Sequence, residues 1–169
     1  MNLNLRSSLT SRILSCALSF ALLALVLAAP TRAASWSGIE PFKSRRADVE
    51  RALGAPVSDK LGDGDTLQFR VAGGLVTVAF VTRRFVETKK LNPQLEGTVL
   101  QIILQHENAP DTPETLNLKS DSDFKREDRN SVSVFRNTRD GMFYTFVNNR
   151  LKTTRYAPTA EQQTSLQKR

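Results

Sequence analysis

This chain contains few of the residues that usually carry chemistry. Its 169 residues include one cysteine and one histidine. The cysteine, Cys16, lies within an N-terminal apolar run, so the rest of the chain has no thiol to form a disulfide, act as a nucleophile or bind a metal. His106 is then the only side chain whose unperturbed pKa lies near neutral pH. The composition disfavours thiol enzymes and histidine-rich metal sites, and it predicts a fold held by an ordinary hydrophobic core.

The first 33 residues have the pattern of a secretory signal peptide. Arg6 and Arg12 lie in a polar head that precedes an almost unbroken apolar run at residues 13–29. The small side chain of Ala33 suits cleavage after that position, and an uncleaved membrane anchor is the alternative. A lipoprotein is disfavoured because most of the apolar run follows Cys16. The pattern predicts export, to the periplasm or out of the cell.

The chain is basic, with a formal net charge of +7. Removal of residues 1–33 would take away three arginines and no acid, which leaves a net charge of about +4. A modest positive charge on an exported domain suits weak contact with anionic envelope polymers or lipid headgroups. It is poor evidence for nucleic-acid binding, so we expect no nucleic-acid partner.

Residues 34–157 have the pattern of a single domain. Val49 and Leu53 belong to a helical apolar stripe that Gly54 ends, which predicts a short helix over residues 44–54. Alternating or continuous apolar runs bounded by turn residues predict six strand candidates, at residues 66–71, 75–81, 98–105, 131–137, 141–147 and 150–156. Residues 158–169 are polar and predict a flexible tail.

These elements define the fold class that we expect. It is an α+β fold in which one or two short N-terminal helices pack on an antiparallel sheet of about five or six strands. The single tryptophan, Trp36, precedes the first helix, and we expect it to cover the edge of the core rather than to form a ligand platform.

Two segments resemble a family of uncharacterised exported bacterial proteins. The first contains the motif Trp-x-Gly-Ile-x-Pro at residues 36–41, followed by Ser-x-Arg-x-Asp-Val at 44–49 and Leu-Gly-x-Pro at 53–56. The second, residues 140–158, is similar to the closing strands of that family and ends in Tyr-x-Pro. Together these segments cover about a third of the chain that follows the signal peptide.

A more distant resemblance comes from the helix that ends in Leu53-Gly54-x-Pro56 and leads into strands. It is similar to the SmpA/OmlA outer-membrane assembly lipoproteins and to the β-lactamase inhibitory proteins, although the lipid-anchored cysteine of the lipoproteins is missing here. Both groups pack helices on one face of an antiparallel sheet and act by binding other proteins. The resemblance therefore implies a protein-binding role, and it implies no catalytic residue and no cofactor.

The best candidate contact surface is a basic segment. Four cations, Arg83, Arg84, Lys89 and Lys90, lie within eight residues and create a local positive field. Phe85 lies among them and could anchor a partner, because apolar groups flanked by charge do so at interfaces. We expect either an envelope or secreted protein partner or, as an alternative, an anionic envelope polymer or lipid bound electrostatically through this basic loop. A purely solubilising role is the third interpretation.

Catalytic and metal sites find little support. His106 is followed by Glu107, which could orient it as a general base in a small enzyme, but a nucleophile motif is missing. Two aspartate pairs, at residues 63 and 65 and at residues 121 and 123, begin like calcium loops, yet the later positions lack the required ligands. The sequence predicts an exported, non-enzymatic protein-binding module of the bacterial cell envelope, with no catalytic residue, metal or cofactor, and no feature indicates its oligomeric state.

Overall fold

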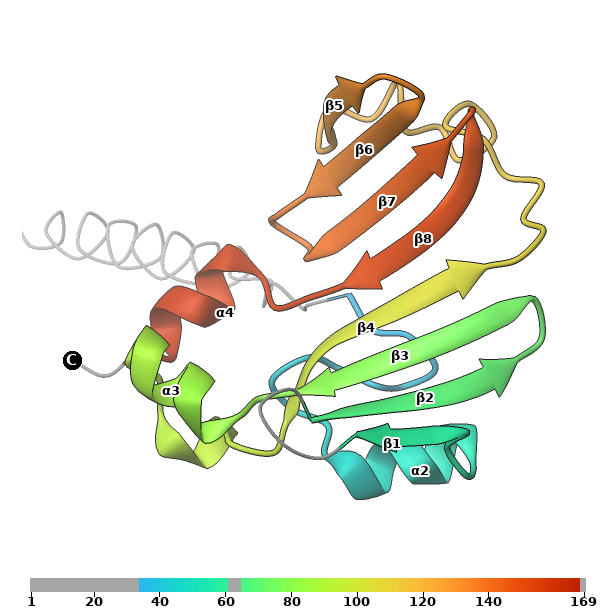
Figure 1. Cartoon of the computed structure of the whole chain (residues 1–169). Coiled ribbons are helices and arrows are strands. Elements are labelled where there is room, and N and C mark those ends of the chain that lie inside the picture. Colours follow the sequence, from blue (N-terminus) through green and yellow to red (C-terminus); the bar gives the residue numbers. More distant parts are fainter. Residues whose placement is uncertain (1–33, 61–64, 168–169) are drawn as a thin grey trace, which may run out of the picture. The chain divides into compact units, whose positions relative to one another are not determined.

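A computed structural model of the chain describes residues 34–60 and 65–167, with the side chain of Lys60 excepted. The predicted signal peptide at residues 1–33 and the aspartate at position 63 lie outside these ranges. Strands make up most of the regular structure, and every strand pairs antiparallel to its neighbours (Figure 1). The strands are β1 (Ser58–Lys60), β2 (Thr66–Val71), β3 (Gly74–Phe80), β4 (Val99–His106), β5 (Lys125–Arg129), β6 (Val132–Asn137), β7 (Met142–Val147) and β8 (Arg150–Tyr156).

These strands form one sheet in the order β1-β2-β3-β4-β8-β7-β6-β5. The order consists of two meanders, β1 to β4 and β8 to β5, that meet where β4 pairs with β8. The helices are α2 (Arg46–Leu53), α3 (Arg83–Lys89) and α4 (Ala160–Ser165), with a 3₁₀ turn at Pro93–Leu95. Within the described ranges no helix is long and apolar enough to span a bilayer.

The expected fold class of five or six strands is wrong, because the sheet has eight strands. All six strand candidates are strands, and the two that were missed, β1 and β5, lie at the two edges of the sheet. β5 has the sequence Lys-Arg-Glu-Asp-Arg, and all five of its residues are exposed. An edge strand that buries neither face shows no apolar alternation, and charged side chains there discourage pairing with another chain.

The helices also differ from the expectation of one or two N-terminal helices. α2 lies where a helix was predicted, but the basic segment forms helix α3 rather than a loop. The Thr82 hydroxyl caps α3 by accepting a hydrogen bond from the Phe85 N–H at 3.2 Å, and Lys90 ends it in the left-handed conformation. The predicted polar tail contains α4, which begins with a capping box between Thr159 and Gln162.

Three apolar clusters form the core. The first covers the inner sides of β2, β3 and β4 with Ile39 and with Val49 of α2, and Trp36 packs against its edge as expected. The second packs α3 and the 3₁₀ turn against Leu100 and against Leu166, which follows α4. In the third, residues 109–124 cover Phe135, Phe146 and Leu151. The first and third clusters lie on the same face of the sheet, since their strand residues are connected through the pairing register.

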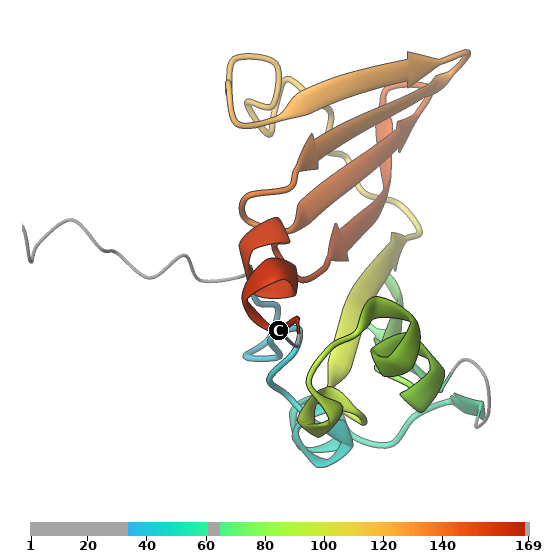
Figure 2. The ribbon, with the colours of Figure 1, turned by 90° about the vertical axis from the view of Figure 1, so that its left-hand side faces the viewer.

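The other face of the sheet carries none of these clusters along the middle of its strands. Figure 1 shows β2, β3, β4, β8, β7 and β6 with no helix drawn in front of them. Figures 1 and 2 place α3 and α4 at one end of this face, near the start of β4 and the end of β8. One transverse row of side chains crosses it from β2 to β5: Gln68, Thr77, Ile103, Arg155, Phe143, Arg136 and Lys125.

Candidate binding groove

The centre of the transverse row is an aromatic ring between two arginines. Phe143 of β7 lies directly opposite Arg136 of β6 on one side and Arg155 of β8 on the other. Side chains that face each other across antiparallel strands have Cβ atoms about 5 Å apart, so these three groups are in contact range. Two guanidinium groups therefore flank one ring on the uncovered face.

A β-bulge brings Arg155 to this position. The two-residue turn at Asn148 and Asn149, both with positive φ, pairs Val147 with Arg150. Continued without interruption, that register would place Thr154 opposite Phe143. The register shifts by one residue between Thr145 and Phe146, and Phe143 faces Arg155 instead. A one-residue shift moves a side chain to the other face, so the bulge places the Arg155 guanidinium on the uncovered face.

The Arg155 guanidinium has no acidic partner among the described residues. Its Cζ atom lies 3.9 Å from the centroid of the Phe143 ring, which is a close cation–π contact. The side chain is half-buried, and this burial lowers the pKa of Arg155, with the nearby charge of Arg136 as a second cause. The cation is thus partly desolvated without a compensating negative charge.

Arg136 differs from Arg155 because its charge is paired with an acidic side chain. Its guanidinium forms an ion pair with Glu127 on the neighbouring edge strand β5. The two arginines and the one glutamate together carry one net positive charge, and the arginine of this set without an ion pair is Arg155.

A depression runs along the sheet at these residues. We call it the sheet groove, and its lining consists of Ile103, Val134, Arg136, Phe143, Thr145, Thr153 and Arg155. A second depression shares Phe143 and Arg155 and continues to the end of the sheet, where residues of α3 and the segment around α4 line it. The two hollows therefore border on each other at Phe143 and Arg155, and each has apolar side chains in its lining.

The structure separates the members of the basic segment. Phe85 is half-buried, packs against the second apolar cluster and lines the extension of the sheet groove. Arg83 lies 3.6 Å from Glu96 through its Nε atom, and Arg84 also has an interaction partner. Lys89 and Lys90 are exposed.

The two arginines of the basic segment line a separate hollow. That hollow also contains Asp65, Glu87 and Glu96. Three acids beside two arginines neutralise the local field, so the structure does not gather the predicted cations into a patch of one sign.

His106 lies under the segment that covers the sheet. Its Nε2 atom is 3.0 Å from the Thr154 hydroxyl. Burial lowers the pKa of His106, and the charge of Asp111 opposes this in part. Glu107, the expected orienting carboxylate, instead forms an ion pair with Arg70. The expected arrangement in which Glu107 orients His106 is therefore not present.

The predicted calcium-like aspartates have other contacts. The Asp123 N–H donates to an Asp121 carboxylate oxygen at 2.9 Å, which is a turn, and the Asp123 carboxylate pairs with Arg139. Within the part of the chain that the structure describes, no three His, Cys, Asp or Glu side chains are placed to hold a metal ion.

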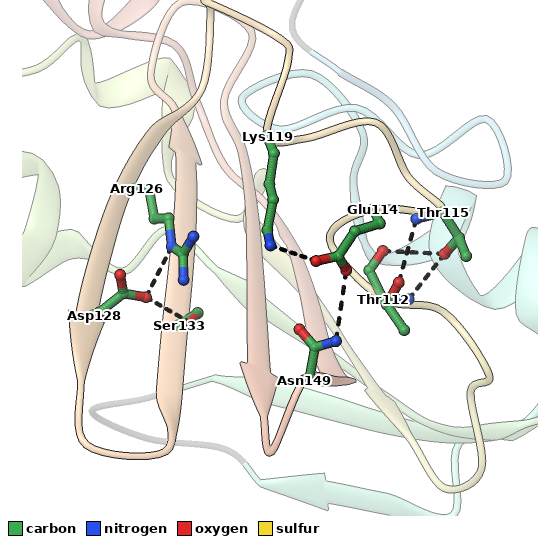
Figure 3. Close-up of polar contacts among 8 residues, drawn as sticks. All are labelled: Thr112, Glu114, Thr115, Lys119, Arg126, Asp128, Ser133 and Asn149. Atoms are coloured by element: carbon green, nitrogen blue, oxygen red, sulfur yellow. Dashed lines mark hydrogen bonds and ion pairs between the residues drawn. The ribbon is translucent and has the colours of Figure 1, made fainter.

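Figure 3 shows two separate groups of polar contacts, one between residues 109–124 and the turn after β7, and one on the β5–β6 hairpin. Glu114 forms an ion pair with Lys119 and lies 3.5 Å from the Asn149 amide, and its contact with Lys119 is the first cause that lowers the pKa of Glu114 to about 2. On the β5–β6 hairpin, Asp128 accepts hydrogen bonds from Arg126 at 2.9 Å and from the Ser133 hydroxyl at 2.6 Å. Of these contacts, the one between Glu114 and Asn149 joins residues 109–124 to the turn between β7 and β8.

Sequence reasoning missed Arg136, Phe143 and Arg155. One signal was present in β7, Met-Phe-Tyr-Thr-Phe-Val, where Phe143 departs from the alternation that Tyr144 and Phe146 define. Apolar side chains on both faces of a strand indicate that both faces make contacts.

The fold and the groove define an antiparallel sheet protein with one covered and one open face. No protein-family model matches this chain, and no curated protein matches it. Among solved structures, it is similar to the crystal structure of a DUF4309 family protein, YjgB from Bacillus subtilis. The identity is 14%, the match covers 72% of this chain and 83% of that chain, and the TM-score is 0.49. At this level the likeness says nothing about function.

Proposed function

We propose that this protein is an exported, non-enzymatic protein-binding module of the bacterial cell envelope and that the sheet groove is its binding surface. The observation that carries the proposal is the half-buried guanidinium of Arg155, which has no acidic partner among the described residues. Partial burial of a charge without a counter-charge costs free energy, and a bound partner that supplies the counter-charge recovers it.

The surroundings of Arg155 support a partner of protein type. Phe143, Val134 and Ile103 offer apolar surface beside the cation. Aromatic residues and arginine are enriched at the energetic centres of protein interfaces, where apolar contact and desolvated hydrogen bonds occur together. Export is the part of the proposal that rests on the sequence of residues 1–33.

The alternative of an electrostatic binder that uses Arg83, Arg84, Lys89 and Lys90 has weaker support. Glu96 lies beside Arg83, and Asp65 and Glu87 line the same hollow. A surface of mixed sign attracts a polyanion less than a patch of one sign does.

Cross-linking in the native cell envelope tests the proposal. The full tagged chain would be expressed in four forms: wild type, Arg155→Met, the control Arg51→Gln on the exposed side of α2, and a form in which the four cations of the basic segment are reversed. We expect one dominant protein partner that is retained by Arg51→Gln and by the reversed form and is lost from Arg155→Met.

Two results would contradict the proposal. Retention of that partner by Arg155→Met would remove the sheet groove from the binding surface. Loss of envelope association in the reversed form, with no protein partner for any form, would favour the binder of anionic polymer or lipid.

A further inference from the structure

The way in which Arg155 stacks on Phe143 determines which of its atoms can bind a ligand. With the guanidinium carbon 3.9 Å from the ring centroid, one planar surface of the guanidinium is occupied by the ring. The N–H groups of a guanidinium lie in its plane and point outward, so a stacked arginine keeps them available for a carboxylate or phosphate. No described acidic side chain takes this position. Arg155 is therefore oriented as an anion receptor.

The charge at the site favours a single negative charge on the ligand. Glu127 already neutralises Arg136, so among the residues that line the sheet groove Arg155 supplies the one charge without an ion pair. A carboxylate carries one charge, whereas a phosphomonoester carries nearly two at neutral pH and would be left partly unpaired. Polyanionic surfaces need several accessible cations, and the groove offers one that is half-buried.

The lining of the hollow favours apolar groups on both sides of that anion. Ile103 and Val134 lie on the sheet side of Arg155. Leu100 and Ala157 lie on the other side, toward α3 and α4. An extended peptide alternates its side chains and is narrow enough to follow such a hollow, whereas a flat bilayer surface reaches only exposed groups.

We infer that the sheet groove binds a partner segment in which one carboxylate lies between apolar residues, and that Arg155 binds this carboxylate through its in-plane N–H groups. This inference rests on the proposed function and adds the chemistry of the partner. Asp, Glu or a chain terminus could supply the carboxylate.

Selection from a displayed library of random linear peptides tests the inference. The bait is the protein purified after expression of the full chain, either as wild type or as Arg155→Met. We expect wild type to enrich peptides that contain an acidic residue flanked by apolar residues, and Arg155→Met to enrich none of these. Replacement of the acidic residue by its amide in an enriched peptide should weaken binding at least about tenfold.

A second variant separates a specific contact from a general charge effect. Arg155→Lys keeps the positive charge but lacks the planar pair of N–H donors, so we expect it to lose most of the affinity for the enriched peptides. The NMR spectrum of the backbone amides of each variant shows whether it keeps the wild-type fold. Equal binding by Arg155→Lys and wild type would overturn the bidentate contact.

The remaining outcomes distinguish the inference from the proposed function. Enrichment of peptides that lack an acidic residue, and whose binding still depends on groove residues, would contradict the recognition of a carboxylate. The proposal that the groove binds a protein would then still stand. Failure to enrich any peptide would overturn the inference, and the envelope cross-linking would then decide the proposed function separately. Binding to phosphatidylglycerol vesicles that Arg155→Met abolishes would overturn both, because the ligand would then be a lipid phosphate.

Discussion

Arg155 is held differently from several other arginines of this protein. Arg46 pairs with Glu50 and Asp59, and Arg139 pairs with Asp123 and Asp140. These are exposed ion pairs, each worth little to stability. Arg155 instead has an aromatic ring on one side and no described acid, which is the arrangement expected of a group kept for binding.

Replacement of Arg155 by Met should therefore spare stability while it removes binding. Methionine fills a similar volume and avoids the cost of a partly desolvated charge, and the lost cation–π contact is worth about 1 kcal/mol. We expect the free energy of unfolding to stay within about 1 kcal/mol of wild type, measured by urea denaturation. A loss of more than about 3 kcal/mol would show that Arg155 serves the fold, and would remove the reason for assigning it to a ligand.

His106 should titrate below its ordinary range. Burial lowers the pKa of His106 from 6.5, so the folded protein binds the proton less readily than the unfolded chain does. Stability that is complete above pH 6.5 should fall as the pH drops below it, and should level off below the folded pKa. The single histidine signal in proton NMR of the untagged protein reports the midpoint, and His106→Gln should flatten this part of the stability profile. A midpoint above 6.5 would contradict the burial.

At the scale of elements, the bulge in β8 decides on which face Arg155 lies. Lys152 is the exposed extra residue between Leu151 and Thr153, whose partners on β7 are Phe146 and Thr145. Insertion of an alanine between Thr145 and Phe146 would give Lys152 a partner, remove the bulge, and turn Phe143 and Arg155 toward the covered face. We expect the insertion to cost more than about 3 kcal/mol and Lys152→Gln to cost less than about 0.5 kcal/mol. Equal stability of the two forms in urea would contradict the role of the bulge.

Helix α4 should contribute to stability despite its polar sequence. Leu166, just beyond the helix, packs with the second apolar cluster, and its carbonyl accepts a hydrogen bond from the Asn92 N–H at 3.0 Å. Because Leu166 is half-buried, we expect Leu166→Ala to cost about 1–2 kcal/mol, and Thr164→Ala on the exposed side to change little. Thermal unfolding of both variants measures the difference. Equal melting temperatures would mean that the helix does not hold the cluster.

The elements that sequence patterns predicted are those whose burial is one-sided and regular. The inner strands alternate or are apolar throughout, and the Asn148-Asn149 turn has the residues that a tight hairpin requires. The missed strands, β1 and β5, lie at the edges of the sheet, where the sequence has no alternation of buried and exposed residues that would indicate a strand. Helices α3 and α4 were missed because their sequences are dominated by charged or polar residues. Few apolar residues in either segment indicate the contacts that hold it in place.

The sheet groove could not be read from the sequence for a different reason. Phe143 and its neighbours in β7 indicate apolar contacts on both faces. The pairing of Arg155 with Phe143, however, depends on a bulge that no glycine, asparagine or other turn residue indicates in the sequence. The basic segment, which the sequence made conspicuous, lies beside acids that are distant along the chain, as Glu96 and Asp65 are. Charge patterns along one segment do not reveal such compensation.

At the scale of the whole described chain, the sheet groove lies where the two meanders meet. β4 and β8 join them through four residue pairs, and the pair Ile103 with Arg155 is one of these. Residues of both meanders therefore line the groove, and it exists only when β4 and β8 are paired. A binding surface at such a junction uses side chains that neither half could bring together by itself.

Site-specific photo-cross-linking in the native envelope tests the central claim most directly. A photoreactive residue would replace Thr145 in the sheet groove and, as a matched control, the exposed Ala52 on α2. The account predicts one cross-linked protein product at position 145, its loss when Arg155→Met is added, and no such product at position 52. A product at position 145 that persists with Arg155→Met, or equal products at both positions, would contradict it.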